Sequence, residues 1–169
     1  MFRSKQKINI RVMKRAIIYM FLFAFLPAFV GGQNIKMVNG LAYNEDDSLL
    51  EGKYNVLYDN EQIKEEYNYH NGILEGFFTA YYENGAIKEQ GLFNNGQKHG
   101  KWTKWTADNQ KIGVVKYDNG FKDGKWQIWD SNGTLRYLMF YDNGHKVGTW
   151  KMFDETGILV KEESFSVSF

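Results

Sequence analysis

The chain has 169 residues, of which 43% are hydrophobic and 17% aromatic, and its 21 Lys and Arg nearly balance its 20 Asp and Glu. That length suits a single domain. Cysteine is absent, which excludes a disulfide framework, a thiol nucleophile and lipid attachment through a cysteine.

Residues 1–32 differ from the rest and predict a secretory signal. Six basic residues and no acidic one stand in residues 3–15, and an almost entirely apolar run follows from Ile17 to Val30. This run is shorter than the roughly 20 residues that a membrane helix needs, and the small residues after it fit cleavage after Gly32. We therefore expect export to the periplasm, the cell envelope or the exterior. An uncleaved anchor and a translation start at Met13 in place of Met1 are the open alternatives.

Removal of this segment changes the charge. It takes 6 basic residues with it, leaving 15 basic residues against 20 acidic ones, a net charge of −5. Nucleic-acid binding depends mainly on neutralising phosphates with Lys and Arg, so a nucleic-acid partner is not expected. Adhesion to anionic lipid by charge alone is not expected either, which leaves membrane contact only weakly supported.

Residues 52–169 repeat with a period of 24. A fixed period is stronger evidence for the fold than the secondary-structure preference of any single segment. Offsets are counted here from the glycine that opens each of five units: Gly52, Gly76, Gly100, Gly124 and Gly148. Offset +2 carries Tyr54, Phe78, Trp102, Trp126 and Trp150, and offset +5 carries Leu57, Tyr81, Trp105, Trp129 and Phe153. A Tyr or Phe recurs at +17, and Asn-Gly recurs at +19 and +20 in four units, with turn glycines Gly72, Gly96, Gly120 and Gly144.

Each unit predicts two strands and two turns, with no room for a helix. An aromatic-rich run fills +1 to +6, a turn follows around +7 to +10, and a second run fills about +11 to +17. Asn-Gly supplies the positive φ angles that tight hairpins require. In the first strand, alternation places +2 and +4 on one face and +5 on the opposite face, unless a bulge intervenes. In the second strand, alternation places +11, +15 and +17 on the same face as each other. Which face forms the core stays open.

A lone two-stranded hairpin is marginal in water, so the units must stack. We therefore expect an all-β, elongated array of about five antiparallel hairpins. Residues 33–51 contain two strand-like runs around Asn39-Gly40 and are interpreted as a degenerate cap over the first edge. The last unit has Val167-Ser168 in place of Asn-Gly and is interpreted as a terminal cap. The organisation is thus a signal at 1–32, capping strands at 33–51 and the array at 52–169.

The pattern resembles the MORN repeat variant proteins. Its best local matches are the stretches from Tyr81 to Trp102 and from Tyr117 to Trp126. It differs from the original MORN repeat because Trp or Phe stands where that repeat has a second glycine. The resemblance implies a twisted array of β-hairpins used as an interaction surface, without catalytic residues. Many bacterial relatives are described as antitoxin-like partners of toxins, which is a cytosolic role.

No residue pattern indicates catalysis, a cofactor or a metal. The histidines His70, His99 and His145 fall at three different offsets, whereas a repeat-built metal site would reuse one. Turn aspartates offer oxygen ligands for calcium, but they more simply bond their own backbone. No Ser-His-Asp order or G-x-S-x-G motif occurs.

The tryptophans are the candidate binding surface: Trp102, Trp105, Trp126, Trp129 and Trp150. Either both rows are core, or one row lines a groove that could stack on sugars, peptide side chains or lipid. We expect an exported, non-enzymatic module that binds another protein or serves as a scaffold in the envelope. The alternatives are an antitoxin-like partner that neutralises a toxin, and a binder of carbohydrate or lipid surfaces.

Overall fold

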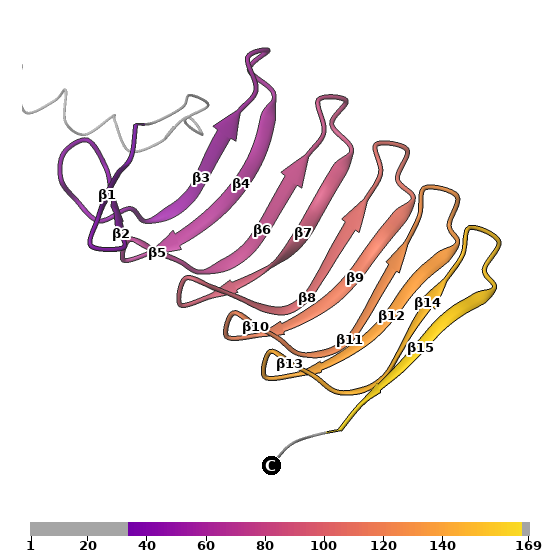
Figure 1. Ribbon diagram of the computed structural model, residues 1–169. Helices are drawn as coiled ribbons and strands as arrows, with labels where there is room; N and C mark the ends of the chain where they lie inside the picture. Colours follow the sequence, from indigo (N-terminus) through magenta and orange to yellow (C-terminus); the bar gives the residue numbers. More distant parts are fainter. Residues whose placement is uncertain (1–33, 167–169) are drawn as a thin grey trace, which may run out of the picture. The chain divides into compact units, whose positions relative to one another are not determined.

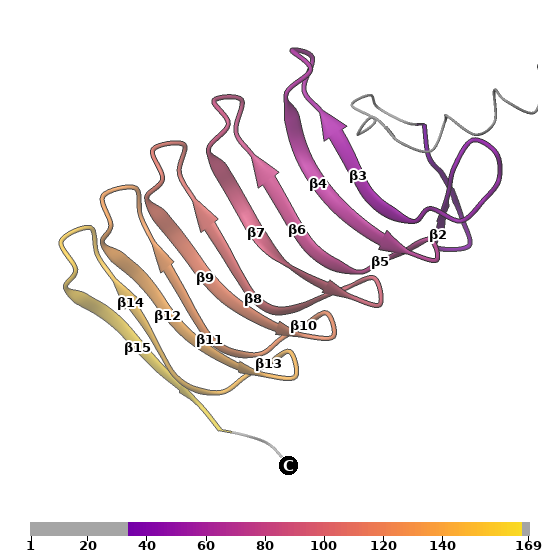
Figure 2. The ribbon, with the colours of Figure 1, turned by 180° about the vertical axis from the view of Figure 1, so that it is seen from behind.

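The structure, a computed structural model, describes residues 34–166. The predicted signal at 1–32 and the Val167-Ser168 pair lie outside the described residues. The described part contains no helix and consists of strands in two sheets. The array at 52–165 forms the larger sheet, in which successive hairpins lie side by side in chain order (Figures 1 and 2). The predicted all-β array of stacked hairpins is therefore confirmed.

Each of the five units contributes one hairpin whose strands begin at the same offsets. The first strand covers 0 to +5, starting at the opening glycine, and the second starts at +11 and reaches +17 or +18; in the third unit the first strand also extends back into the preceding turn. The ten strands are β3 (Gly52–Leu57), β4 (Ile63–His70), β6 (Gly76–Tyr81), β7 (Ile87–Asn94), β8 (Gln97–Trp105), β9 (Lys111–Asp118), β11 (Gly124–Trp129), β12 (Leu135–Asp142), β14 (Gly148–Phe153) and β15 (Leu159–Phe165). Short strands after three Asn-Gly turns complete the sheet: β5 (Ile73–Leu74), β10 (Phe121–Lys122) and β13 (His145–Lys146).

The Asn-Gly turns adopt the backbone that the sequence predicts. Asn143 and Gly144, for example, have φ angles of 45° and 85°, and both signs match a type I′ turn. The opening glycines also have positive φ in all five units, so residues at the same offset share the same backbone conformation. The loop residue at +9 has positive φ as well, even in the first unit, where it is Glu61 with φ 65°.

A β-bulge interrupts every hairpin at the same place. In the fourth unit Ile128 pairs with Tyr137, whereas Trp129 pairs with Leu135, so Arg136 at +12 is the extra residue. The same shift occurs after +4 in the other four units. Residues directly opposite each other share a face. The bulge therefore brings +11 into line with +5, which corrects the prediction that +11 shares a face with +15 and +17.

Neighbouring units join through two patches of backbone pairing. In the middle of the strands, +13 and +14 of one unit pair with +4 and +3 of the next, as Gly113 does with Ile128 and Val114 with Gln127. Near the Asn-Gly turn the chain pairs back on itself, as Tyr141 does with Lys146. Between these patches the carbonyl at +16 accepts the backbone N–H at +23, as Lys116 O does from Asp123 at 3.0 Å.

Residues 34–51 form a separate two-stranded sheet of β1 (Lys36–Val38) and β2 (Leu41–Tyr43). The predicted hairpin around Asn39-Gly40 is thus present. Its backbone hydrogen bonds reach the first Asn-Gly turn: the Ala42 N–H donates to Gly72 O at 2.8 Å, and the Gly72 N–H donates to Leu50 O at 2.9 Å. Within the described residues, β3 remains the terminal strand of the larger sheet, so the hairpin covers the turn rather than pairing with that edge.

The opposite end of the sheet is β15. It pairs with β14 along its length, and no described strand pairs with its other edge. The apolar residues Ile158, Leu159 and Val160 are exposed there. The last unit is thus a full hairpin in which only the turn at +19 and +20 lies beyond the described residues.

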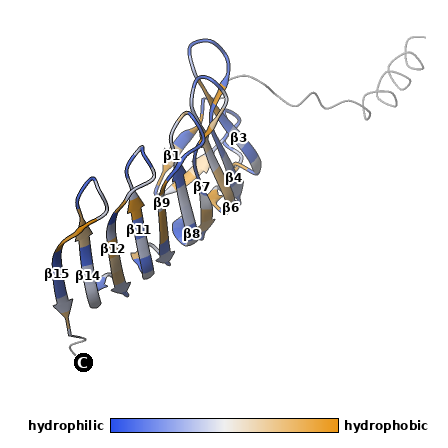
Figure 3. Cartoon of the chain, turned by 90° about the vertical axis from the view of Figure 1, so that its right-hand side faces the viewer, coloured by the Kyte–Doolittle hydropathy of each residue, from blue (hydrophilic) through white to orange (hydrophobic). Residues whose placement is uncertain are grey.

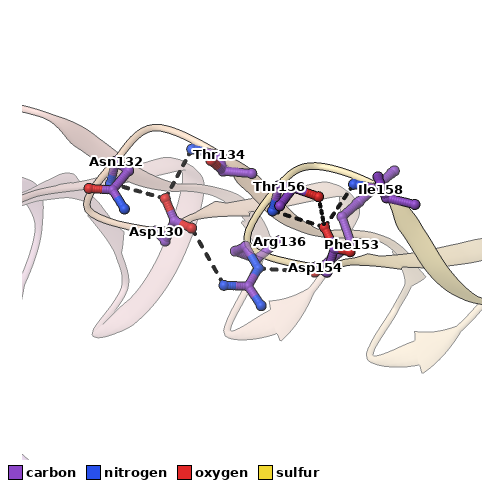
Figure 4. A network of polar contacts seen from close by, with 8 residues as sticks. All are labelled: Asp130, Asn132, Thr134, Arg136, Phe153, Asp154, Thr156 and Ile158. Atoms are coloured by element: carbon purple, nitrogen blue, oxygen red, sulfur yellow. Dashed lines mark hydrogen bonds and ion pairs between the residues drawn. The ribbon is translucent and has the colours of Figure 1, made fainter.

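Polar contacts tie the loop end of each hairpin to its own turn or to the next unit. Figure 4 shows Asp130 accepting from the N–H groups of Asn132 and Thr134, both at 3.0 Å. The bulge residue Arg136 then donates from Nε to Phe153 O in the following unit at 3.0 Å. In the first unit Tyr58 makes the equivalent link, donating its hydroxyl to Tyr81 O at 2.7 Å. The loops are therefore part of the stacking interface.

The core lies on one face of the sheet. Hydrophobic and hydrophilic residues alternate along the strands (Figure 3). The buried cluster combines side chains from offsets +2, +4, +15 and +17: Phe78, Ala80, Trp102, Val115, Trp126 and Tyr141. We call this side the ladder face.

Candidate functional site

A continuous row of aromatic rings runs along the ladder face, and we call this row the ladder. The rings at +2 and +17 contact each other within and between units, with one further ring, Tyr67, at +15. From Phe78 to Phe165, successive ring centroids along the row lie 5.0–6.3 Å apart, mostly in edge-on or tilted geometry. Such pairs stabilise beyond their buried area, so the row holds neighbouring hairpins together.

Tryptophan at +2 is fixed at its edge as well as at its faces. The indole N–H of Trp126 donates to Lys116 O at 2.9 Å, and that of Trp150 donates to Phe140 O at 2.9 Å. Trp102 makes the same bond to Leu92 O at 3.2 Å. Each acceptor belongs to the preceding unit at +16. These bonds pair a polar group that would otherwise be buried unsatisfied.

The +2 tryptophans are therefore structural, which narrows the predicted binding surface. Trp102 is 1% exposed and Trp126 is 9% exposed, so at most a small part of each ring is open to solvent. Trp150, in the last unit, is half-buried. The spacing of the tryptophans is the same in all three units, and only burial separates the core members from the rest.

A lysine covers each of these tryptophans, and sequence reasoning missed it. The Lys98 Nζ lies 3.6 Å from the ring centroid of Trp102, and Lys122 and Lys146 lie 4.8 and 4.5 Å from Trp126 and Trp150. These lysines share offset +22, so the recurrence was visible in the sequence. A cation over an aromatic face is attracted by the ring quadrupole.

The tryptophans at +5, Trp105 and Trp129, differ from those at +2. Both are half-buried. No described residue accepts a hydrogen bond from either indole N–H, in contrast to Trp126. Of the five predicted surface tryptophans, these two keep an unpaired donor for a ligand.

A hollow of about 280 Å³ opens on the ladder face at the junction of the third and fourth units. We call it the Gly113 hollow, after the strand glycine in its wall. Its apolar and aromatic lining comes from Ile112, Val115, Tyr117, Trp126, Ile128 and Trp129, and its charged lining from Glu89, Lys98 and Lys104. The charges pair with each other: Glu89 lies 3.3 Å from Lys98 Nζ and 3.8 Å from Lys104 Nζ. The hollow thus has apolar walls and a polar rim.

A second hollow, also of about 280 Å³, lies at the fourth and fifth units. Tyr137, Met139, Trp150 and Met152 form its apolar lining, with Lys146, Lys161 and Glu163 around them. Tyr137 is 42% exposed. This hollow adjoins the last strands of the sheet, where no further described hairpin follows.

The histidines make pairs rather than clusters. His70 Nδ1 lies 2.8 Å from Glu51, and this hydrogen bond raises the pKa of His70 above its ordinary 6.5. Glu51 also accepts from the Asn71 N–H, the largest cause of its lowered pKa. His99 pairs with Asp118 at 3.3 Å. Across residues 34–166, no three His, Asp or Glu side chains gather as metal ligands would.

Burial dominates the titration of the ladder tyrosines. It is the first cause of the raised pKa of Tyr67, Tyr69 and Tyr117. Tyr67 also donates its hydroxyl to Glu65 at 2.9 Å, which raises its pKa further. These phenols stay neutral at physiological pH and act as packing groups.

Comparison with known proteins gives the family. The profile described as MORN repeat variant matches residues 74–95, 122–143 and 146–166. The chain belongs to the MORN repeat variant family. Each matched segment starts at offset +22. The MORN-variant unit therefore begins at the lysine that lies over the tryptophan at +2, or at Leu74 in its place, and ends at offset +18 or +19 of the following unit.

Other comparisons add little to the MORN-variant assignment. No curated protein matches the chain. One solved structure with detectable likeness is described as a GtfA/B complex bound to UDP and GlcNAc, with 10% identity and a TM-score of 0.28. The match covers 85% of this chain and only 26% of that one, and a likeness this distant supports no inference about this chain. None of the elements in residues 34–166 is a helix long and apolar enough to cross a membrane.

Proposed function

We propose that this MORN-variant protein is an exported, non-enzymatic module that binds another protein in the cell envelope. The observation that carries the proposal is the ladder face, where apolar hollows open beside paired lysines and glutamates. An apolar centre within a polar rim is the anatomy of protein–protein contact sites. The basic and apolar composition of residues 1–32 supports export.

The rigidity of the array supports the same function. Ring contacts and indole hydrogen bonds fix the ladder face before any partner arrives. A surface that is already ordered loses little conformational entropy on binding. The hydroxyl–carboxylate pairs Ser48–Asp46 and Thr156–Asp154 lie in exposed turns, and each carboxylate also accepts a backbone N–H of its own turn. These pairs therefore stabilise turns.

Site-specific photocrosslinking in the native cells tests both parts of the proposal. A photoreactive phenylalanine analogue replaces Tyr137, which is exposed on the ladder face, and a matched variant carries it at Asn132 in a loop. We expect one discrete cross-linked protein from position 137 and none from 132, in the envelope or periplasmic fraction. Cross-linking to a toxic effector in the cytosol would instead support the antitoxin-like role. Equal, diffuse cross-linking from both positions would contradict a specific partner.

A further inference from the structure

Two glycines lie inside strands without positive φ, and only one of them is required by packing. A Cβ added at Gly91 would overlap the Trp102 indole, so this position admits no side chain. A Cβ added at Gly113 would meet its nearest neighbours, Lys104 Cβ and Ile128 Cδ1, at 3.6 and 3.7 Å. Those are ordinary contact distances, so a Cβ fits at Gly113 without displacing a neighbour.

The fold does not need the glycine at 113. The other four units place full side chains at this offset: Glu65, Glu89, Tyr137 and Lys161. Glycine weakens a strand, because it loses more conformational freedom on folding and packs nothing against its neighbours. Because residue 113 has no side chain, the Gly113 hollow stays open between Lys104 and Ile128.

The chemistry of the Gly113 hollow favours an apolar occupant. The Trp126 N–H is already bonded to Lys116 O, and Glu89 is paired with both lysines. The charged side chains of the hollow and its buried indole thus have partners within the protein, and the Trp129 N–H and the Tyr117 hydroxyl are the uncharged side-chain polar groups of its lining with no hydrogen-bond partner in residues 34–166. A sugar would give up hydrogen bonds to water and find few replacements, whereas an apolar side chain would leave water for apolar and aromatic walls.

The size and charge of the hollow narrow the occupant further. Its volume of about 280 Å³ lies just below the roughly 300 Å³ at which drug-sized pockets begin, so it suits a single side chain. Two lysines against one glutamate leave the rim with an excess of one positive charge. Charge complementarity across an interface then favours an acidic neighbour on the partner.

From these contacts we infer that the Gly113 hollow receives one apolar side chain of a partner protein, with an acidic residue of that partner facing Lys98 and Lys104. The inference rests on the proposed protein-binding function and locates its anchor point. It assigns Gly113 a role in recognition, since the missing side chain makes the space for the anchor.

Peptide selection tests this assignment. A random-peptide display library is selected on the purified protein, and synthetic versions of the enriched peptides are titrated against wild type, Gly113→Val and Lys101→Val. Lys101 is the control because it is an exposed strand residue on the opposite face. We expect peptides with Leu, Phe, Tyr or Trp beside Asp or Glu, binding Gly113→Val at least about tenfold more weakly than wild type and Lys101→Val equally. Gly113→Val should also unfold at a higher urea concentration.

Three results would overturn the inference: no peptide whose binding depends on the open hollow, a Gly113→Val protein that is less stable than wild type, or occupation of the hollow by a methyl glycoside in place of the peptides. The envelope partner from photocrosslinking separates this inference from the proposed function. If that partner binds wild type and Gly113→Val equally, protein binding stands and the role of Gly113 falls. If no partner exists, the proposed function falls first.

Discussion

Gly91 and Gly113 show how one residue type meets opposite demands in two neighbouring units. At Gly91 the Trp102 indole occupies the space that a Cβ would need, and the indole is held by its bond to Leu92 O. At Gly113 the same space is empty. Sequence alone presents both simply as glycines in strands, and only the position of the neighbouring ring distinguishes them.

This contrast predicts opposite effects of the same substitution. Gly91→Ala should lower the free energy of unfolding by roughly 1–3 kcal/mol, because the indole must shift. Gly113→Ala should raise it by roughly 0.5–1 kcal/mol, because alanine in a strand loses less entropy than glycine. Urea denaturation of both variants beside wild type measures the difference. Equal effects at the two positions would contradict the steric account of Gly91.

The contact between His70 and Glu51 predicts a pH dependence at the first turn. The raised pKa of His70 means that its contribution to stability is complete below 6.5 and is lost as the pH rises through the folded value. The lowered pKa of Glu51 means that its contribution is present above 4.5 and is lost as the pH falls through the folded value. The contact is therefore strongest between about pH 4.5 and 6.5.

An NMR titration of the His70 imidazole checks this prediction. We expect a midpoint above 6.5 in wild type and a lower midpoint in Glu51→Gln, which removes the charged acceptor. An unchanged midpoint in the variant would show that Glu51 does not hold the imidazolium.

At the scale of the element, each unit is a bulged hairpin. In the third to fifth units, the indole N–H of the tryptophan at +2 donates a hydrogen bond to the preceding unit. The carbonyl at +16 accepts the indole N–H at +2 of the next unit as well as the backbone N–H at +23. The bulge at +12 lets Arg136 reach forward to Phe153 O. The fourth hairpin thus contacts both neighbours through side chains that hydrogen-bond main-chain atoms.

The hydrogen bond from the indole at +2 to the preceding unit predicts that tryptophans at +2 contribute more to stability than tryptophans at +5. Trp126→Phe keeps a ring in the ladder but removes the donor to Lys116 O, which should cost about 1 kcal/mol beyond the loss of ring area. Trp129→Phe is the matched control, because no described residue accepts from its indole N–H. Chemical denaturation of both variants measures the two costs. Equal costs would contradict a stabilising role for the indole bond.

At the scale of the whole array, strict periodicity makes the units interchangeable at their junctions. Deleting residues 124–147 would bring Lys122 over Trp150 and place Lys116 O within reach of the Trp150 indole, which recreates the contacts of the original junction. Repeat proteins of this kind gain stability from each added unit and its interface.

We therefore expect thermal stability to follow the number of units. A second copy of residues 124–147 inserted before Gly148 should raise the unfolding temperature, and deletion of that segment should lower it while the protein still folds. Calorimetry measures both midpoints. Inserting only 125–147 is the control, because this copy lacks its opening glycine, and the one-residue loss shifts its first strand out of register with the preceding hairpin. This variant should gain no stability from the added copy. Unfolding temperatures that ignore unit number would contradict an additive array.

The sequence by itself determined the period, the hairpins and the turns. Asn-Gly at a constant offset requires positive φ, and few other backbones than a type I′ hairpin provide it, so Gly72, Gly96, Gly120 and Gly144 were assignable from spacing alone. It also identified the family, because the recurring residues are the structural ones.

Only the tertiary structure decided which tryptophans are core, where the bulge lies, and which glycine leaves a hollow. Trp126 and Trp129 belong to the same aromatic pattern, yet one is bonded beneath Lys122 and the other keeps its N–H free. The physical reason is that periodicity fixes what recurs within a unit, whereas burial and open volume arise between units. Each depends on side chains that belong to different units in the sequence and are adjacent across the sheet.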